Sequence, residues 1–271
     1  MSVDKSIGFV GAGNMGGAII RGLLSAGTHS PSDLIVSDYS ESVIRDLNSS
    51  FPGIRTSSSN VNPAAAPVVI LAVKPQAYKS VVQSIKDTVQ PETIMVSIAP
   101  GLSIERIAKW FNHDVKIVRT MPNMPALARE GTTALCRNRQ VSDEEFQGVR
   151  EIFDAVGKCI ILPESLMNAY TALAGSSPAW IFVLIEALAD GAVREGISRS
   201  EAYEIASQVV AGSARLVSES GLHPAVLKDK ICSPGGTTIE ALAALESAGF
   251  RSAIIQTVYA CAAKARELSN E

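Results

Sequence analysis

The sequence feature that most constrains the fold is a glycine-rich turn between an apolar stretch and the start of a helix. Residues 7–10 are typical of a short buried strand, and residues 17–24 continue as a helix. The turn holds five candidate ligand-binding residues, Gly11, Gly13, Asn14, Met15 and Gly16. Its glycines fit G-x-G-x-x-G, which allows a tight turn, close approach of a pyrophosphate, and close packing of helix and strand. The segment therefore predicts dinucleotide binding, with a purely structural turn as the alternative.

Composition and charge exclude several other classes. The 271 residues, 46% hydrophobic and 19% charged, are enough for one large domain or two ordinary ones. A net charge of -3 and the lack of a basic run give no reason to expect nucleic acid or an anionic membrane as partner. The longest apolar run, residues 179–185, is far shorter than the ~20 residues that span a bilayer. Residues 1–5 leave no room for a signal peptide before the first strand, so we expect a soluble, cytoplasmic protein.

The cysteines and histidines suggest neither a metal site nor a disulfide framework. They are scattered, without a C-x-x-C pair, at Cys136, Cys159, Cys232, Cys261, His29, His113 and His223. Free thiols in a reducing cytosol and surface or capping histidines are the expected roles. No metal is predicted.

Strands and helices alternate through the first part of the chain. The expected strands are residues 34–38, 67–75, 93–98, 115–119, 132–136 and 159–162, and the expected helices are residues 78–89, 104–111 and 142–155. Residues 57–60 are expected to form a polar loop. Because the apolar strands suit a parallel sheet covered on both faces, residues 1–163 are predicted to form a doubly wound α/β domain.

Two charged residues lie at the ends of predicted strands, where ligands of such sheets bind. Asp38 lies near the interval at which a carboxylate accepts hydrogen bonds from an adenosine ribose, and it would then repel a 2′-phosphate. This favours NADH only slightly: no arginine follows immediately, but the Ser37 and Ser40 hydroxyls beside it could still hydrogen-bond a phosphate. A helix cap or turn aspartate is the alternative. Lys74 ends the strand at residues 67–75, and a solvated surface lysine is the alternative there.

The remainder, residues 164–271, is predicted to be an all-helical domain. The expected helices are residues 179–195, 199–219, 223–230, 238–247 and 251–268. Ser176, Ser177 and Pro178 have the chemistry of a helix start. Residues 179–195 are apolar around most of the helix circumference, so this helix should be buried on several sides. We therefore expect a homodimer that shares this core, with packing inside one chain as the alternative.

Residues 233–238 form a polar island, Ser-Pro-Gly-Gly-Thr-Thr, in the helical half. This is a glycine turn rich in hydroxyl groups that opens a helix. Free N–H groups at a helix start make a good carboxylate site. An ordinary helix cap is the alternative, because serine and threonine are common caps.

Taken together, these motifs resemble the pyrroline-5-carboxylate reductase family. The matching segments are residues 11–16, 72–75, 121–126, 175–179, 223–224 and 233–238. The resemblance implies a Rossmann domain that binds NADPH or NADH, a helical dimerisation domain, and a homodimer or a larger ring of dimers. It also implies reduction of 1-pyrroline-5-carboxylate to L-proline. The chain departs from the family pattern at Ser177, where glycine is usual, and at Trp180, where tyrosine is usual, which affects the shape of the substrate pocket.

The resemblance also implies roles for single residues. Asn60 would meet the adenosine side of the cofactor. The groove would be lined by Ala72, Val73, Lys74 and Pro75, with Ala99 and Pro100 near the nicotinamide half. The substrate carboxylate and ring nitrogen would be held by Ser233, Gly236, Thr237 and Thr238, with Glu164 nearby. We hypothesise that the Thr238 hydroxyl orients or protonates the ring nitrogen and that catalysis is mainly positioning.

Two other functions fit parts of the sequence. A β-hydroxyacid-type dehydrogenase would need an acid–base lysine in the helical half, where Lys228 and Lys230 are the candidates near the polar island. A non-catalytic NAD(P)-binding redox sensor would need only the first domain, and the intact polar island argues against it.

Overall fold

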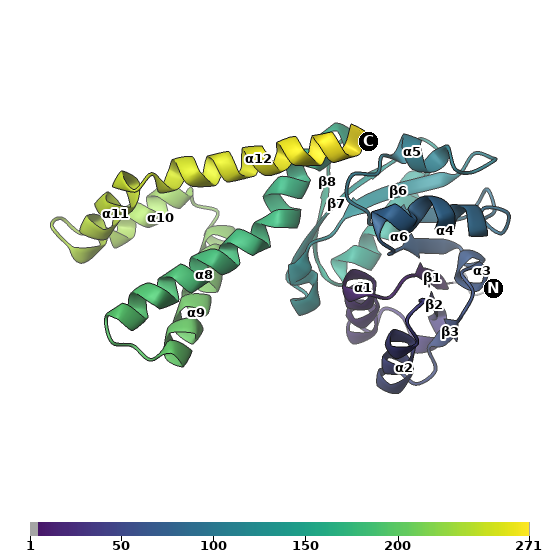
Figure 1. Cartoon of the computed structure of the whole chain (residues 1–271), viewed down its shortest axis with the longest axis horizontal. Helices are drawn as coiled ribbons and strands as arrows, with labels where there is room; N and C mark the ends of the chain where they lie inside the picture. The colour runs from purple at the N-terminus through teal and green to yellow at the C-terminus, as the bar shows by residue number, and fades with distance from the viewer. Residues whose placement is uncertain (1–4, 271) are drawn as a thin grey trace. The chain divides into compact units, whose positions relative to one another are not determined.

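A computed structural model describes residues 5–270 and divides the chain into two compact units (Figure 1). The first unit takes the chain up to Ser176, together with the C-terminal helix from Cys261 onward. The second unit is Ser177–Ala260.

The first unit is built on one eight-stranded sheet with the order β3-β2-β1-β4-β5-β6-β7-β8. The strands are β1 Ile7–Val10, β2 Leu34–Ser37, β3 Arg55–Ser57, β4 Val68–Leu71, β5 Ile94–Ser97, β6 Lys116–Met121, β7 Gly131–Arg137 and β8 Gly157–Ile161. All neighbours are parallel except β6 and β7. The order reverses at β1, as in a doubly wound sheet, so the predicted α/β class is confirmed.

Sequence reasoning was wrong about the start of the polar loop at residues 57–60. Ser57 is the last residue of β3, which pairs with β2 through Ile35–Arg55 and Ser37–Ser57. This edge strand has three residues, all polar and none fully buried. Backbone hydrogen bonds to β2 hold β3 in the sheet. The sequence of β3 lacks the apolar pattern by which strands are recognised.

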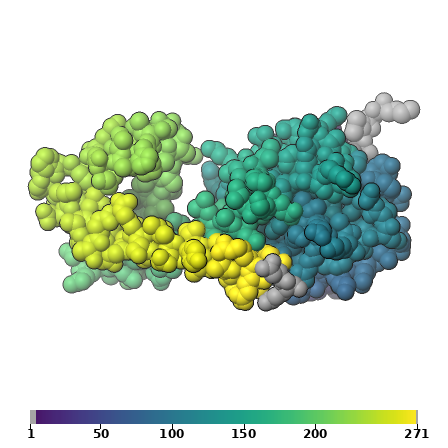
Figure 2. All heavy atoms as spheres, turned by 90° about the horizontal axis from the view of Figure 1, so that it is seen from above, coloured from purple at the N-terminus to yellow at the C-terminus, as the bar shows by residue number. Residues whose placement is uncertain are grey.

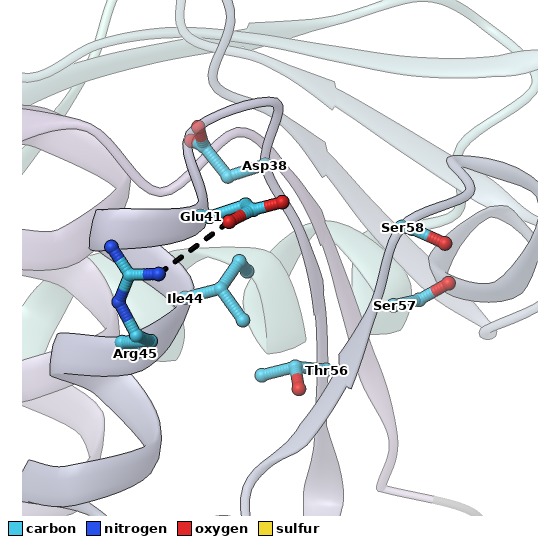
Figure 3. A pocket seen from close by; sticks show the side chains of 7 residues that line it. All are labelled: Asp38, Glu41, Ile44, Arg45, Thr56, Ser57 and Ser58. Carbon is cyan, nitrogen blue, oxygen red and sulfur yellow. Dashed lines mark hydrogen bonds and ion pairs between the residues drawn. The ribbon is translucent and has the colours of Figure 1, made fainter.

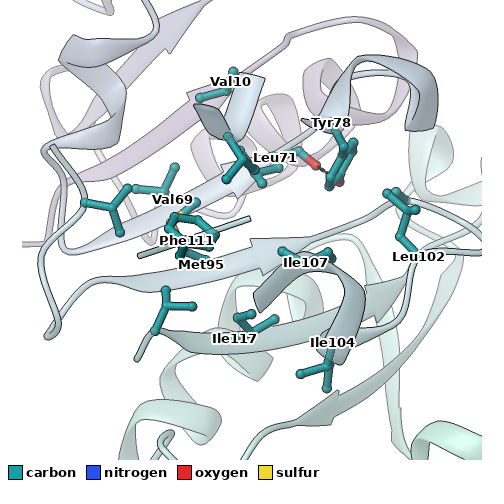
Figure 4. Close-up of a cluster of buried hydrophobic side chains, with 14 of the residues drawn as sticks. Val10, Val69, Leu71, Tyr78, Met95, Leu102, Ile104, Ile107, Phe111 and Ile117 are labelled. Carbon is teal, nitrogen blue, oxygen red and sulfur yellow. Dashed lines mark hydrogen bonds between the residues drawn. The ribbon is translucent and has the colours of Figure 1, made fainter. Parts of the chain in front are cut away.

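Helices cover both faces of the sheet. They are α1 Asn14–Ser25, α2 Glu41–Ser50, α3 Val61–Ala64, α4 Tyr78–Ile85, α5 Ile104–Ala108, α6 Asp143–Asp154 and α7 Met167–Tyr170. Neighbouring strand residues point to opposite faces: Leu71 packs in a cluster with α4 and α5 (Figure 4), and Ile70 packs in a second cluster with α1 and α6. Two buried cores therefore hold the strand ends in fixed positions.

The second unit consists of helices throughout residues 177–260. They are α8 Ser177–Arg194, α9 Arg199–Ser220, α10 Pro224–Ile231, α11 Thr237–Ser247 and α12 Phe250–Asn270, the last of which continues into the first unit. Helix α8 begins at Ser177, within the predicted start at Ser176–Pro178, but the predicted capping role is wrong, because a π-helical segment, Thr171–Ser176, runs directly into α8. The change to α-helical bonding comes next to Pro178, whose missing N–H interrupts a regular ladder.

Helix α8 is far more exposed within one chain than its composition predicts. Of its 18 residues only Pro178 and Ala189 are buried, and Phe182 and Val183 are 54% and 61% exposed. Figure 2 shows open space between the green and yellow helices of this unit. The alternative of packing within one chain is therefore wrong. An apolar helix this exposed needs a cover of protein or lipid.

By length and composition alone, the helical segment Glu164–Arg194 could cross a membrane. Its most apolar window has a mean hydropathy of 1.6 and is 17% buried. The prediction from unbroken apolar runs missed it because that criterion stops at each small or polar residue. A subunit interface selects the same composition, since its helices are also covered on all sides in the assembly.

Candidate cofactor and substrate sites

The three glycines of the turn each have a different structural reason. Gly11 has a φ of 96°, and a Cβ there would lie 2.8 Å from the carbonyl oxygen of Ala72. A Cβ on Gly16 would lie 2.5 Å from the carbonyl oxygen of Gly11, so this position sets the close approach of α1 to the turn. A Cβ on Gly13 would have no neighbour within 4 Å. The side of the turn at Gly13 is therefore open to a ligand, as the sequence pattern predicts.

Helix α1 begins on this open side without a capping side chain. Gly13 is its N-cap and makes no side-chain hydrogen bond, and the first turn holds no acidic residue. Asn14 is exposed and Met15 half-buried. The N–H groups of the first turn and the positive end of the helix dipole are thus available to an anion such as a pyrophosphate.

Asp38 joins the glycine turn to the end of β2. Its Oδ2 accepts from the N–H of Ala12 at 2.7 Å, and its Oδ1 accepts from the N–H of Ser40 at 2.8 Å. Nearby, the Ser37 hydroxyl donates to Oδ1 of Asn60 at 2.8 Å. The structure therefore brings Asp38 and Asn60 together with the glycine turn at the carboxyl end of β2. It also shows that Asp38 is a turn aspartate. Its predicted contact with a ribose stays a proposal.

A cavity of about 300 Å³ opens beside Asp38, between α2 and β3 (Figure 3). It is lined by Asp38, Glu41, Ile44, Arg45, Thr56, Ser57 and Ser58. Sequence reasoning missed Arg45 because it considered only residues immediately after Asp38. The signal was present, since Arg45 is one turn along α2 from Glu41 and therefore shares its helix face.

The predicted groove residues 72–75 follow β4 and border the glycine turn. The N–H of Ala72 donates to the carbonyl oxygen of Val10 at 2.8 Å, and Val73 lies against Gly11. Lys74 is exposed, and within residues 5–270 the structure shows no ion pair of its ammonium group. Its role therefore remains open between ligand contact and solvated surface.

A buried hydroxyl network fixes the neighbouring strand ends and was not predicted. The Tyr78 hydroxyl donates to the carbonyl oxygen of Leu71 at 2.5 Å and accepts from the Ser97 hydroxyl at 3.2 Å. The N–H of Ala99 donates to the Ser97 oxygen at 3.4 Å. Burial raises the pKa of Tyr78 well above its usual value, so its hydroxyl stays protonated. The network holds Ala99 and Pro100, the predicted nicotinamide neighbours, at the end of β5.

Glu164 has strong partners inside the first unit. Its Oε1 accepts from the N–H of Ile104 at 2.8 Å and from Nη1 of Arg119 at 2.9 Å. Arg119 is 5% exposed, whereas a third of the Glu164 side chain is exposed. The pair anchors the start of the long helical segment to β6. The predicted role of Glu164 near the substrate remains a proposal.

The polar island lies in the second unit, at the start of α11. Gly235 has a φ of 64°, and the N–H of Gly236 donates to the carbonyl oxygen of Ser233 at 3.0 Å. Gly236 is the N-cap and makes no side-chain hydrogen bond. The alternative of a hydroxyl cap is therefore wrong. The N–H groups of Thr237 and Thr238 lack a capping partner at the start of this helix, which suits a carboxylate ligand.

Lys228, one of the two lysines that a β-hydroxyacid-type dehydrogenase could use, does not have the environment of an acid–base group. Lys228 forms an ion pair with Asp229 at 2.6 Å, and that hydrogen bond raises the pKa of Lys228. A lysine that acts as a general base near neutral pH needs a lowered pKa instead. The capping role predicted for His223 is confirmed, because its Nδ1 accepts from the N–H of Ala225 at 3.2 Å. Within residues 5–270 no group of three or more potential ligand side chains could hold a metal.

Fold and site define a Rossmann-type, NAD(P)-dependent oxidoreductase with a separate helical dimerisation unit. Residues 6–101 match the family model "NADP oxidoreductase coenzyme F420-dependent", and residues 164–268 match "Pyrroline-5-carboxylate reductase dimerisation". Pyrroline-5-carboxylate reductase of Escherichia coli (strain K12) is 41% identical over 268 residues, 98% of this chain and 99% of the relative. The chain belongs to the pyrroline-5-carboxylate reductase family.

Solved structures agree over the full chain. A pyrroline-5-carboxylate reductase from Coxiella burnetii superposes with a TM-score of 0.91 at 34% identity and covers 97% of this chain and 98% of that one. The Plasmodium falciparum pyrroline carboxylate reductase, solved with NADP bound, has a TM-score of 0.87 at 30% identity with the same coverage. The predicted two-domain class and helical dimerisation domain are confirmed.

Proposed function

We propose that this protein reduces 1-pyrroline-5-carboxylate to L-proline with NADPH or NADH as hydride donor, the last step of proline biosynthesis. The observation that carries this proposal is the similarity of the entire chain, at 41% identity, to an enzyme of that name. Both halves that the reaction requires are present in the chain: an open glycine turn and an uncapped polar helix start.

The first unit fits a dinucleotide. The open side of Gly13 and the free N–H groups of α1 accommodate a pyrophosphate, and Asp38 and Asn60 lie where its adenosine half would follow. Ala72–Pro75, Ala99 and Pro100 line the groove beyond the ends of β4 and β5. When bound, the dinucleotide supplies the hydride. The protein's part is to hold and orient the cofactor and to exclude water.

The second unit supplies the groups for the substrate. The N–H groups around Gly236 and Thr237, with the Ser233 hydroxyl, bind the carboxylate of the cyclic imine. The Thr238 hydroxyl orients the ring nitrogen or donates a proton to it. Because a cyclic imine is readily protonated on nitrogen, the reaction needs no side chain with a strongly shifted pKa. We also propose Glu164, in the first unit, as a substrate-binding residue.

The test is to add 1-pyrroline-5-carboxylate to pure protein, follow NADH and NADPH oxidation by absorbance, and identify the product. Stoichiometric formation of L-proline is expected, and cofactor binding without turnover would contradict the proposal. Thr238→Ala should lower kcat/KM about tenfold if it removes one neutral hydrogen bond, whereas loss of a required acid should cost roughly a hundredfold or more. Thr238→Ser, which keeps the hydroxyl, is the matched control. Unchanged kcat/KM in Thr238→Ala would remove Thr238 from the mechanism.

The protein's assembly and location complete the proposal. We propose a cytoplasmic homodimer, which can assemble further into a ring of dimers, with residues 1–163 as cofactor domain and residues 164–271 as dimerisation and substrate domain. The dimerisation family match over residues 164–268 and the exposed apolar surface of α8 support it. Light scattering should give at least twice the 28.5 kDa mass of one chain. A monodisperse monomer at micromolar concentration would contradict it.

A further inference from the structure

We propose that the cavity lined by Asp38, Glu41 and Arg45 selects NADH over NADPH, with Asp38 as the specificity-determining residue. This inference rests on the proposed function, because it assumes that the adenosine half of the cofactor enters this cavity. NADH and NADPH differ there by one phosphate on the ribose 2′-oxygen. A cavity that offers an acceptor for the 2′-hydroxyl favours NADH, whereas a cavity that offers donors for the 2′-phosphate favours NADPH.

Asp38 offers a rigid acceptor. Hydrogen bonds of 2.7 and 2.8 Å from two backbone N–H groups fix its carboxylate. Each oxygen accepts one of these bonds and retains capacity for another, so the group can still accept from ribose hydroxyls. Within residues 5–270 no ion pair to Asp38 is seen, so no cation neutralises it. A 2′-phosphate would meet a fixed negative charge there.

The positive groups of the cavity are already compensated by the protein's own carboxylates. Arg45 pairs with Glu41 at 3.4 Å (Figure 3). At the start of α2, the N–H of Ser40 donates to Asp38, and Glu41 occupies the first turn. Both features that could attract a phosphate, a guanidinium and a helix N-terminus, therefore have an anion beside them. Two carboxylates against one guanidinium leave the lining with a net negative charge.

Two of the hydroxyl groups near Asp38, those of Ser57 and Ser40, are also engaged. The Ser57 hydroxyl donates to the carbonyl oxygen of Ser59 at 2.9 Å and accepts from the Asn62 side chain at 3.0 Å. The Ser40 hydroxyl bonds with that of Ser42 at 2.8 Å. A hydroxyl has one proton to donate, so the Ser57 hydroxyl could donate to a phosphate only if its bond to Ser59 broke.

Asp38 and Glu41 should contribute unequally to the discrimination against a 2′-phosphate. The Arg45–Glu41 pair is exposed, with side chains 71% and 91% accessible, so it is weak and easily separated. Asp38 is held in place by two bonds and cannot move away without loss of both. Asp38 therefore carries most of the discrimination, whereas Arg45 is a latent phosphate ligand that Glu41 restrains.

The kinetic test compares kcat/KM for NADH and NADPH in the wild type and three single variants. The wild type should favour NADH about tenfold or more, the range expected for a hydrogen bond to a charged group. Asp38→Asn should lose NADH efficiency and gain NADPH efficiency. Glu41→Gln, which does not touch the glycine turn, should raise NADPH efficiency a few-fold and so shift the ratio of the two efficiencies toward NADPH. The matched control is Asp46→Asn, which removes the same charge from α2 at an exposed residue outside the cavity lining, and it should leave the ratio unchanged.

A binding test separates this inference from the proposed function. Calorimetric titration with 5′-AMP and with 2′,5′-ADP compares two probes that differ only by the 2′-phosphate and needs no imine substrate. Tighter binding of 5′-AMP supports the inference even if 1-pyrroline-5-carboxylate is not reduced, which would contradict the proposed function alone. Equal or tighter binding of 2′,5′-ADP, or a wild-type preference for NADPH in turnover, overturns the inference. Binding of neither probe, with no binding of NADH or NADPH, overturns both.

Discussion

Replacement of Gly13 by alanine should separate cofactor binding from folding, because the turn places this glycine against open space. Its φ of -62° is ordinary for alanine, and a Cβ there would have no neighbour within 4 Å. Gly8 is the contrasting position. A Cβ on Gly8 would lie 1.9 Å from the carbonyl oxygen of Pro63, a backbone atom that cannot rotate away.

The expected magnitudes follow from this difference. Alanine is a poorer N-cap than glycine by about 1 kcal/mol, and the less flexible unfolded chain offsets about 0.4–1 kcal/mol of that. Gly13→Ala should therefore shift Tm by no more than about 4 °C. For the cofactor, a methyl group on the pyrophosphate side should cost about 1.5–3 kcal/mol, a rise in Kd of about tenfold to a hundredfold. Gly8→Ala should exceed the usual 1–3 kcal/mol range of overpacking and unfold much of the protein.

The assay combines thermal melts, with and without NADH, and a fluorescence titration that yields Kd. Gly13→Ala should melt like the wild type without ligand and lose most of the ligand-induced rise in Tm. Wild-type affinity for both NADH and NADPH in Gly13→Ala would refute the assignment of the pyrophosphate to this turn. A large fall in the Tm of Gly13→Ala without ligand would refute the conclusion that the space beside Gly13 is open.

Three further outcomes are expected. Burial raises the pKa of Cys136 and Cys159 to about 12, so only about one thiol in ten thousand is a thiolate at pH 8. Iodoacetamide should therefore modify these cysteines only after unfolding. Rapid labelling in the native state would contradict this prediction. Burial, the largest single influence, opposes ionisation of Glu145, but the hydrogen bonds from Lys116 and Ser142 and the charge of Lys116 together outweigh it and lower the pKa of Glu145 from 4.5. Its contribution is therefore present above pH 4.5 and lost in acid, so the Tm difference between wild type and Glu145→Gln should shrink as pH falls; a constant difference would count against it. Val183→Asp, at an exposed residue of α8, should reduce the mass measured by light scattering to that of a monomer. A dimer that persists in this variant would show that Val183 lies outside the interface.

Local pattern was enough to predict most strands and the glycine turn. β4 and β5 are short runs of apolar residues that alternate between the two cores, and composition alone marks such runs. The turn was predictable because Gly11 and Gly16 answer local backbone requirements and Gly13 leaves one side of the turn open. β3 could not be predicted in this way, because its three polar residues belong to the sheet only through their pairing with β2.

The partners of the candidate site residues could not be predicted, because they are distant in the sequence. Asp38 bonds to a backbone group 26 residues away, and Glu164 bonds to groups 45 and 60 residues away. The hydroxyl of Tyr78 meets that of Ser97 only because β4 and β5 are neighbours. Residue type and spacing suggest that such groups have a role, but the sheet order decides which groups they meet.

The exposed helices of the second unit make the strongest case that one chain is not the complete folding unit. In residues 177–260 only four residues are buried, namely Pro178, Ala189, Ala202 and Ala206. None of them has a large side chain, so their burial contributes little to the free energy of folding. A helical unit of this size needs far more buried apolar surface to offset the loss of chain entropy. The large apolar side chains of α8 are present but uncovered, and burying them against a second copy would supply the missing core. Dimerisation is therefore a condition for a stable second unit.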